Sequence, residues 1–150
     1  MTRGTIRGAA LAAACALALL GGCADNSGPQ DISGSWKGPL TLRVAGGLEL
    51  GGELALQLEQ NDDFASGGAL WAPIGEPQGI AGPVDGIEVT LRLIFRCAES
   101  FETTVLVGEV SGDSIDFLSV SGTACRLNGN PRVVEGGDFS LTRTSDDVPL

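Results

Sequence analysis

Hydrophobic and polar residues alternate with a period of two through most of the chain after residue 31. In the segment 88–96, the sequence Glu-Val-Thr-Leu-Arg-Leu-Ile-Phe-Arg places a hydrophobic side chain at almost every second position. Such alternation is typical of a strand with one face on a hydrophobic core and the other on water. No segment of this part has the i, i+3, i+4 spacing of an amphipathic helix. The pattern therefore predicts an all-β domain.

Turn-forming residues interrupt the alternation about every ten residues. The breaks are Asn61-Asp62-Asp63, Asp85-Gly86, Gly112-Asp113 and Asn128-Gly129-Asn130-Pro131, and Asp-Gly in particular favours a tight hairpin. They divide the chain into predicted strands at 34–44, 52–60, 64–72, 78–84, 86–96, 102–111, 114–124 and 135–143. Hairpin links predict an antiparallel up-and-down meander of about eight strands, closed or nearly closed into a barrel, because closure removes exposed strand edges.

The first 22 residues have the composition of a secretory signal peptide. Arg3 and Arg7 precede an uninterrupted run of apolar residues at 9–20. As a helix this run would rise only ~18 Å, which is too short for the ~30 Å hydrocarbon core of a bilayer. We therefore interpret residues 1–22 as a signal and not as a membrane span.

The sequence Leu20-Gly21-Gly22-Cys23 resembles the lipobox of bacterial lipoproteins. The resemblance implies a diacylglycerol-modified Cys23, a flexible tether at 23–31, and a membrane anchor in the bacterial cell envelope. Because Ala24 and not Asp follows the cysteine, the family's sorting rule would send the protein to the outer membrane of a Gram-negative cell. The alternative is an ordinary secretory cleavage that leaves Cys23 as a free thiol.

Composition narrows the function classes. Without the first 22 residues, 128 remain, with 19 acidic and seven basic side chains. This balance argues against nucleic-acid binding, which needs a basic surface. The chain has no His, which excludes imidazole as a base or metal ligand. The length allows a single domain at 32–144, followed by a frayed tail at 145–150.

Two cysteines are left for the folded domain. Cys15 leaves with the signal and Cys23 takes the lipid, so Cys97 and Cys125 form an even pair in an oxidising compartment. We predict a disulfide between them, which is worth roughly 3.5 kcal/mol in the chain-entropy model. A metal-binding pair would lack further ligands, because there is neither His nor a CxxC motif.

The two ends of the domain resemble lipocalins and their calycin relatives. Gly34-Ser35-Trp36 matches the Gly-x-Trp pattern of their first strand, and Arg143 lies late in the last predicted strand. In calycins a basic residue at that position lies across the tryptophan and closes one end of the barrel, which implies a cation–π contact between Trp36 and Arg143. Unlike true lipocalins, the chain is short and has no C-terminal helix pattern. It is most similar to small bacterial lipoproteins of unassigned role.

The sequence contains no recognisable catalytic motif. Asp62-Asp63 and Asp146-Asp147 are the only adjacent carboxylates, and we interpret them as a solvated turn and a tail, not as a metal site. No serine lies in a Gly-x-Ser-x-Gly motif, and Lys37 is the only lysine. We therefore expect that the protein is not an enzyme, and that it has no catalytic residues, no metal and no cofactor.

Three exposed-looking residues are candidate contacts for a ligand or partner. Arg92 and Arg96 share one face of a strand, where they would receive an anionic headgroup or an acidic partner, or else form ion pairs with Glu102 or Glu109. Trp71 precedes a proline-rich loop, where it would either line a barrel mouth or plug the barrel end.

Two functions fit these expectations. The first is a lipid-anchored envelope barrel that binds a small apolar ligand or lipid in the periplasm or at the cell surface. The second is a packed barrel that presents its loops to an envelope protein, as an assembly factor or a hydrolase inhibitor. A cavity in the barrel favours the first function, and a filled barrel with an apolar outer patch favours the second.

Overall fold

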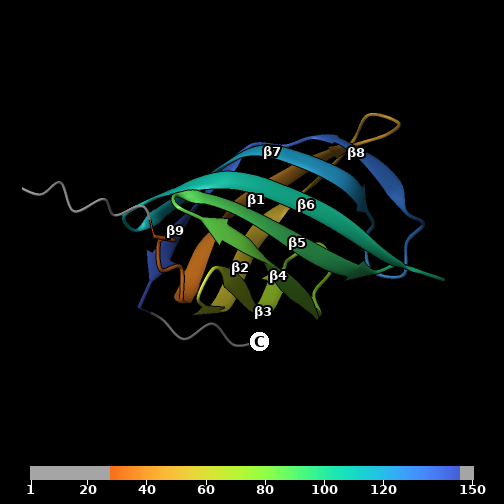
Figure 1. Cartoon of the computed structure of the whole chain (residues 1–150). Helices are drawn as coiled ribbons and strands as arrows, with labels where there is room; N and C mark the ends of the chain where they lie inside the picture. The colour runs from red at the N-terminus through yellow and green to blue at the C-terminus, as the bar shows by residue number, and fades with distance from the viewer. Residues whose placement is uncertain (1–27, 146–150) are drawn as a thin grey trace, which may run out of the picture.

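The computed structural model describes residues 28–145. The predicted signal peptide, the lipobox with Cys23, and Asp146-Asp147 lie outside this range. Every regular element in it is a strand (Figure 1). The strands are β1 (Gly34–Val44), β2 (Leu48–Asn61), β3 (Phe64–Trp71), β4 (Pro77–Asp85), β5 (Glu88–Arg96), β6 (Phe101–Ser111), β7 (Ser114–Ala124), β8 (Arg132–Gly136) and β9 (Phe139–Thr144).

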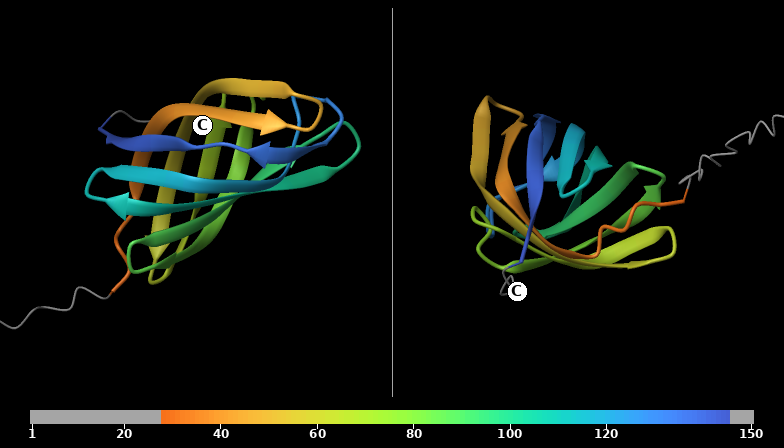
Figure 2. Two further views of the ribbon diagram at one scale, coloured as in Figure 1. Left: turned by 90° about the horizontal axis from the view of Figure 1, so that it is seen from above. Right: turned by 90° about the vertical axis from the view of Figure 1, so that its left-hand side faces the viewer.

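The strands form one closed antiparallel barrel. Each strand from β1 to β7 pairs with the next along the chain. The barrel closes because β8 and β9 both lie between β7 and β1 and pair with each of them (Figure 2). The predicted all-β meander of about eight strands is therefore confirmed, with one extra strand.

The last side of the barrel is divided into two strands. We expected a single strand at 135–143, and this is wrong: β8 pairs with the end of β1 at Val44, and β9 pairs with its beginning at Trp36. The break falls at Gly137-Asp138, where a Cβ on Gly137 would lie 2.9 Å from the carbonyl oxygen of Thr41. The backbone passes β1 so closely here that regular pairing is interrupted.

Three tight turns lie where the sequence places them. Asp62, Gly86 and Gly112 have φ angles of 55°, 58° and 59°. This left-handed conformation is open to glycine and tolerated by aspartate, which explains the turn chemistry of the sequence.

The meander gives the barrel two different ends. The β2–β3, β4–β5 and β6–β7 turns and the start of β1 lie at one end, which we call the closed end. The connections at 45–47, 72–76, 97–100 and 125–131 lie at the other, which we call the mouth (Figure 2).

The interior of the barrel is filled with side chains. Trp36, Trp71, Phe95 and Leu106 point inward from different strands, and each has 0% of its surface exposed. A void large enough to hold a water molecule would give its lining side chains exposed surface. The zero values therefore show close packing around these residues.

Candidate functional site

Arg143 covers the closed end of the barrel. It faces Trp36 across the β1–β9 pair, and its guanidinium carbon lies 4.4 Å from the tryptophan ring centroid. Its Nη1 and Nη2 donate to the carbonyl oxygens of Ser33 and Asp31, the latter at 2.9 Å, and its Nε lies 3.1 Å from a carboxylate oxygen of Asp113. The structure thus contains the Trp36–Arg143 contact that the resemblance implied.

The segment 30–33 is a strap that completes this end. Two of its hydrogen bonds run from the backbone N–H of Gln30 to the carbonyl of Gly86, at 2.8 Å, and from that of Ile32 to the side chain of Gln60, at 2.9 Å. Ile32 is fully buried, and its carbonyl accepts from Trp36 Nε1 at 2.9 Å. The chain therefore enters the barrel across the closed end.

The carboxyl group of Asp31 in this strap has a lowered pKa. The Ser33 side chain is the main cause, and a hydrogen bond from the Ser33 backbone N–H, at 2.9 Å, adds to it. Burial opposes the shift, and the charge of Arg143 lowers the pKa further.

A disulfide fixes two loops of the mouth. Cys97 and Cys125 are bonded, with their Cα atoms 5.9 Å apart, which confirms the predicted pair. The 125–131 loop folds over the 97–100 loop, and the N–H of Ala98 donates to the carbonyl of Gly129 at 3.1 Å. The mouth is thereby held in one shape.

Trp71 plugs the barrel behind these loops. It is fully buried, its ring centroid lies 5.8 Å from that of Phe95, and its Nε1 donates to the carbonyl of Leu40 at 3.4 Å. Of the two roles considered for Trp71, the structure shows the plug, so this side chain does not offer a rim contact to a ligand or partner.

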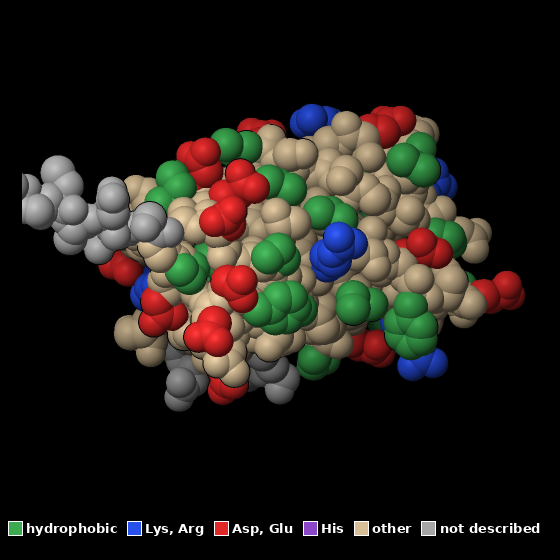
Figure 3. Space-filling view, viewed as in Figure 1, with side chains coloured by type: hydrophobic (Ala, Val, Ile, Leu, Met, Phe, Trp, Pro, Cys, Tyr) green, Lys and Arg blue, Asp and Glu red, His purple; other side chains and the backbone are tan. Residues whose placement is uncertain are grey.

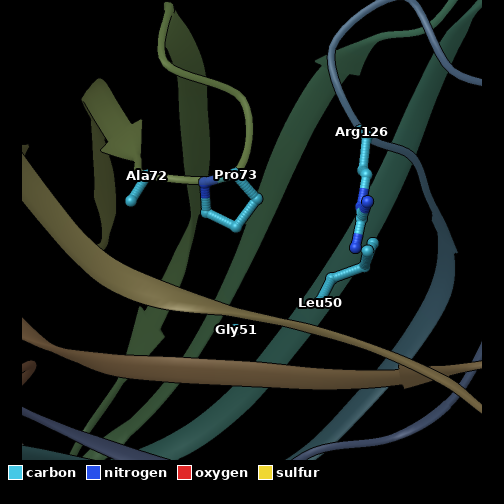
Figure 4. A pocket seen from close by; sticks show the side chains of 5 residues that line it. All are labelled: Leu50, Gly51, Ala72, Pro73 and Arg126. Atoms are coloured by element: carbon cyan, nitrogen blue, oxygen red, sulfur yellow. The ribbon is translucent and has the colours of Figure 1, made fainter.

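An open cleft lies at the mouth, outside the packed interior. It has a volume of about 380 Å³, and Figure 4 shows the Arg126 side chain on one side of it, Ala72 and Pro73 on the other, and Leu50 next to the guanidinium. A second hollow of about 200 Å³ shares Leu50 and Arg126 with the first. The two hollows therefore adjoin each other, and we call them together the mouth cleft. Its further lining residues are Leu48, Gly51, Cys125, Gly129, Asn130 and Arg132.

A second feature lies on the outside of the barrel, over β5 and β6. Arg92 pairs in register with Val105, and Arg96 with Phe101. Ile94 lies between the arginines and is 43% exposed, and Phe101 is 76% exposed. We call these five residues the β5–β6 face. A hollow of about 340 Å³ borders it, lined by Glu76, Pro77, Gln78, Gly79, Ile94, Arg96 and Phe101.

Figure 3 shows this side of the molecule. Acidic side chains are frequent on the half next to the grey atoms at the left, and on the other half hydrophobic side chains lie among Lys or Arg and acidic ones.

The arginines of the β5–β6 face have no acidic partner in the barrel. The ion pairs with Glu102 or Glu109 that we considered are absent: Glu102 accepts from the Ser100 hydroxyl at 2.7 Å, and Glu109 lies opposite Glu88. Within residues 28–145 the one ion pair joins Arg143 to Asp113. Arg92 and Arg96 are thus free to meet an anion from outside.

The described part of the chain offers no metal cluster. No group of three or more Cys, Asp or Glu side chains in residues 28–145 is arranged to hold a metal ion. In the same range there is no helix long and apolar enough to cross a membrane.

Comparisons with known proteins show no family. No protein-family model matches the sequence, and no curated protein matches it. Among solved structures, the chain is similar to the crystal structure of Rv2717c from M. tuberculosis, with a TM-score of 0.38 and 15% identity. The match covers 75% of this chain and 92% of that one. A likeness of this size carries no functional assignment.

The sequence reading missed the mouth cleft and the hydrophobic part of the β5–β6 face. Arg126 directly follows Cys125 and precedes a turn, so its place at the mouth was readable once the disulfide was predicted. The position of Leu50 and Pro73 opposite it depends on how the 72–76 loop folds, and no local signal in the sequence gives that.

Proposed function

We propose that this protein is a lipid-anchored lipoprotein of the bacterial cell envelope whose packed barrel is a protein-interaction module. Its binding surface is the β5–β6 face. The observation that carries the proposal is the presence there of two arginines, Arg92 and Arg96, that have no carboxylate partner among residues 28–145 and flank the exposed side chains of Ile94 and Phe101.

The filled interior supports this function over that of a barrel that encloses a ligand. An eight-stranded barrel is just wide enough to be filled by its own side chains or to hold one small molecule. Here Leu91, Leu93 and Phe95 point into the barrel and have 0% of their surface exposed. A ligand inside would have to displace several such side chains, each of which contributes roughly 1.5–3 kcal/mol by its burial.

The composition of the β5–β6 face fits a protein partner. Arginine and aromatic residues are enriched where protein interfaces contribute most of their binding energy. Arg92 and Arg96 are four residues apart on one strand face, so their Cα atoms are separated by roughly 13 Å. We expect the partner to be an envelope protein with carboxylates at a similar spacing beside an apolar area, and the association to weaken with salt.

The lipobox and the strap together support the anchored geometry. Because Gln30 is already bonded to the barrel, residues 24–29 would let it lie at most roughly 25 Å from a lipidated Cys23, and the strap at 30–33 leads the chain into the closed end. In this arrangement the mouth and the adjoining part of the β5–β6 face point away from the membrane that holds the anchor.

Replacing the lipobox cysteine tests the anchor. We expect Cys23→Ser to abolish incorporation of radioactive palmitate and to release the protein into the soluble fraction. Cys15→Ser, which changes a cysteine of the signal, is the matched control and should keep both label and membrane association. Unchanged membrane retention of Cys23→Ser would overturn the anchor.

Charge reversal on the barrel tests the interaction surface. The full-length protein is isolated from its own envelope in mild detergent, and the proteins that accompany it are compared among three forms. We expect Arg92→Glu/Arg96→Glu to lose a partner that the wild type retains. Lys37→Glu/Arg43→Glu makes the same charge change on the outer face of β1 and should retain it. If the three forms carry the same proteins, the proposed surface is wrong.

A further inference from the structure

We infer that the mouth cleft binds a single-chain anionic amphiphile, with the anionic head at Arg126 and Arg132 and the chain against the apolar part of the lining at Leu48, Ala72 and Pro73. This binding site lies apart from the β5–β6 face and does not depend on the interaction proposed above. It also differs from an internal lipocalin-like ligand site, because the barrel interior is filled.

The charge of the cleft selects an anion. Arg126 makes no ion pair or side-chain hydrogen bond with any described residue. Arg132 uses Nη1 to donate to the carbonyl of Ala45 at 3.0 Å, which leaves the rest of its guanidinium available. Neither hollow of the cleft is lined by Asp or Glu, although the chain has 19 acidic and nine basic residues. Other hollows differ in this respect, since Glu76 and Glu99 line two of them.

Apolar side chains line part of the cleft. Leu48 and Leu50 come from the start of β2, and Ala72 and Pro73 from the loop after β3. Figure 4 shows the gap between Pro73 and Arg126 across which a chain would lie. A charged guanidinium beside an apolar surface suits a molecule that has both an anionic group and a hydrocarbon chain.

The cleft is held open before any ligand arrives. The disulfide fixes Cys125, the residue before Arg126, and the N–H of Gly129 donates to the Arg126 carbonyl at 2.7 Å. On the opposite wall, a Cβ on Gly52 would lie 2.8 Å from Pro73 and 2.9 Å from Ala72, so the 72–76 loop rests directly on the backbone of β2. Such preorganisation lowers the entropic cost of binding.

Titration calorimetry on the mature domain from residue 24 tests the site with defined probes. Dodecanoate and dodecyl phosphate carry an anionic head on a twelve-carbon chain, dodecyl maltoside has the chain without the charge, and acetate has the charge without the chain. All are used below the concentration at which micelles form. We expect saturable binding of at least one of the two anionic probes, and the tighter one identifies the preferred head. Dodecyl maltoside and acetate should each bind at least about tenfold more weakly.

Three variants locate the binding. Arg126→Gln should weaken the binding of the anionic probe by about tenfold or more. Ala72→Phe should abolish binding, because the phenylalanine side chain would fill the cleft from an exposed position. Lys37→Gln removes a positive charge on the outer face of β1, outside the cleft, and should bind as the wild type does. Circular dichroism and thermal unfolding confirm that each variant is folded. The inference is overturned if neither anionic probe saturates, if dodecyl maltoside binds equally well, or if Arg126→Gln binds unchanged.

Discussion

At the scale of single residues, Arg143 joins the largest number of separate parts of the closed end. One guanidinium stacks on Trp36, donates to two carbonyls of the strap and forms an ion pair with Asp113. The Asp113 side chain is 80% exposed, so this ion pair adds little. The cation–π contact and the hydrogen bonds to the strap contribute more, because they link β1, β9 and the N-terminal segment.

Substitution of Arg143 tests this assignment. We expect Arg143→Met to lower the free energy of unfolding by roughly 2–3 kcal/mol, since it removes the hydrogen bonds and the cation–π contact together. Arg143→Lys keeps the charge but not the fork of donors, and should cost roughly 1–2 kcal/mol. The measurement is urea denaturation. Arg92→Met is the control, because the Arg92 side chain has no ion pair or hydrogen bond within the described residues 28–145, and it should stay within about 0.5 kcal/mol of the wild type. If Arg143→Met and Arg92→Met lowered the free energy of unfolding by the same amount, Arg143 would not stabilise the closed end as described.

The lowered pKa of Asp31 predicts a pH dependence of stability. Because the folded state holds this pKa below its usual value of 3.8, the carboxylate stabilises the fold above that value and loses its effect as the pH falls through the folded-state pKa. Asp31→Asn should therefore be less stable than the wild type at about pH 7, and the difference should shrink toward zero at about pH 2. Unfolding free energies of both proteins at the two pH values give the answer. A difference that stays constant would show that the charge of Asp31 is not responsible.

At the scale of the elements, glycines let the strands of the barrel approach one another. A Cβ on Gly82 in β4 would lie 1.8 Å from the carbonyl oxygen of Thr90 in β5, and one on Gly67 in β3 would lie 1.9 Å from that of Gln57 in β2. No side chain fits these positions without moving a neighbouring backbone. They permit the bends by which the sheet closes.

Two alanine substitutions on the same strand test this point. Gly82→Ala should lower the free energy of unfolding by roughly 1–3 kcal/mol through overpacking. Gly79→Ala is the matched control, because a Cβ on Gly79 would have nothing within 4 Å, and it should be close to neutral. Chemical denaturation of both variants measures the difference, and a neutral Gly82→Ala would show that the close approach is not needed for closure.

Most elements could be predicted from the sequence because their signals are local. The alternation of hydrophobic and polar residues predicts the strands on both sides of Asp62, Gly86 and Gly112, because turn chemistry and periodicity act within a few residues. The division into β8 and β9 could not be predicted, because it depends on the approach of Gly137 to β1, nearly a hundred residues away. The mouth cleft was missed for the same reason: its walls come from segments that are distant along the chain.

At the scale of the whole molecule, charge is distributed unevenly along the barrel axis. The strap and the closed-end turns carry Asp31, Asp62, Asp63, Asp85 and Asp113 against one arginine, Arg143. At or near the mouth, Arg96, Arg126 and Arg132 are mixed with Glu76, Glu99 and Glu102. In an anchored protein the acidic end would face the membrane, and anionic lipids would repel it. The barrel would then stand off the bilayer on its tether with the arginines directed outward, where a partner or an anionic amphiphile could reach them.

Site-specific photo-crosslinking in living cells tests the central claim, that the β5–β6 face is a protein-binding surface, most directly. The photoreactive residue p-benzoylphenylalanine replaces Phe101 in the full-length chain, and Thr41, an exposed residue on the outer face of β1, is replaced in the control. We expect one discrete crosslinked product at position 101 that disappears when Arg92→Glu/Arg96→Glu is combined with it, and no such product at position 41. No product at position 101, or the same product at both positions, would contradict it.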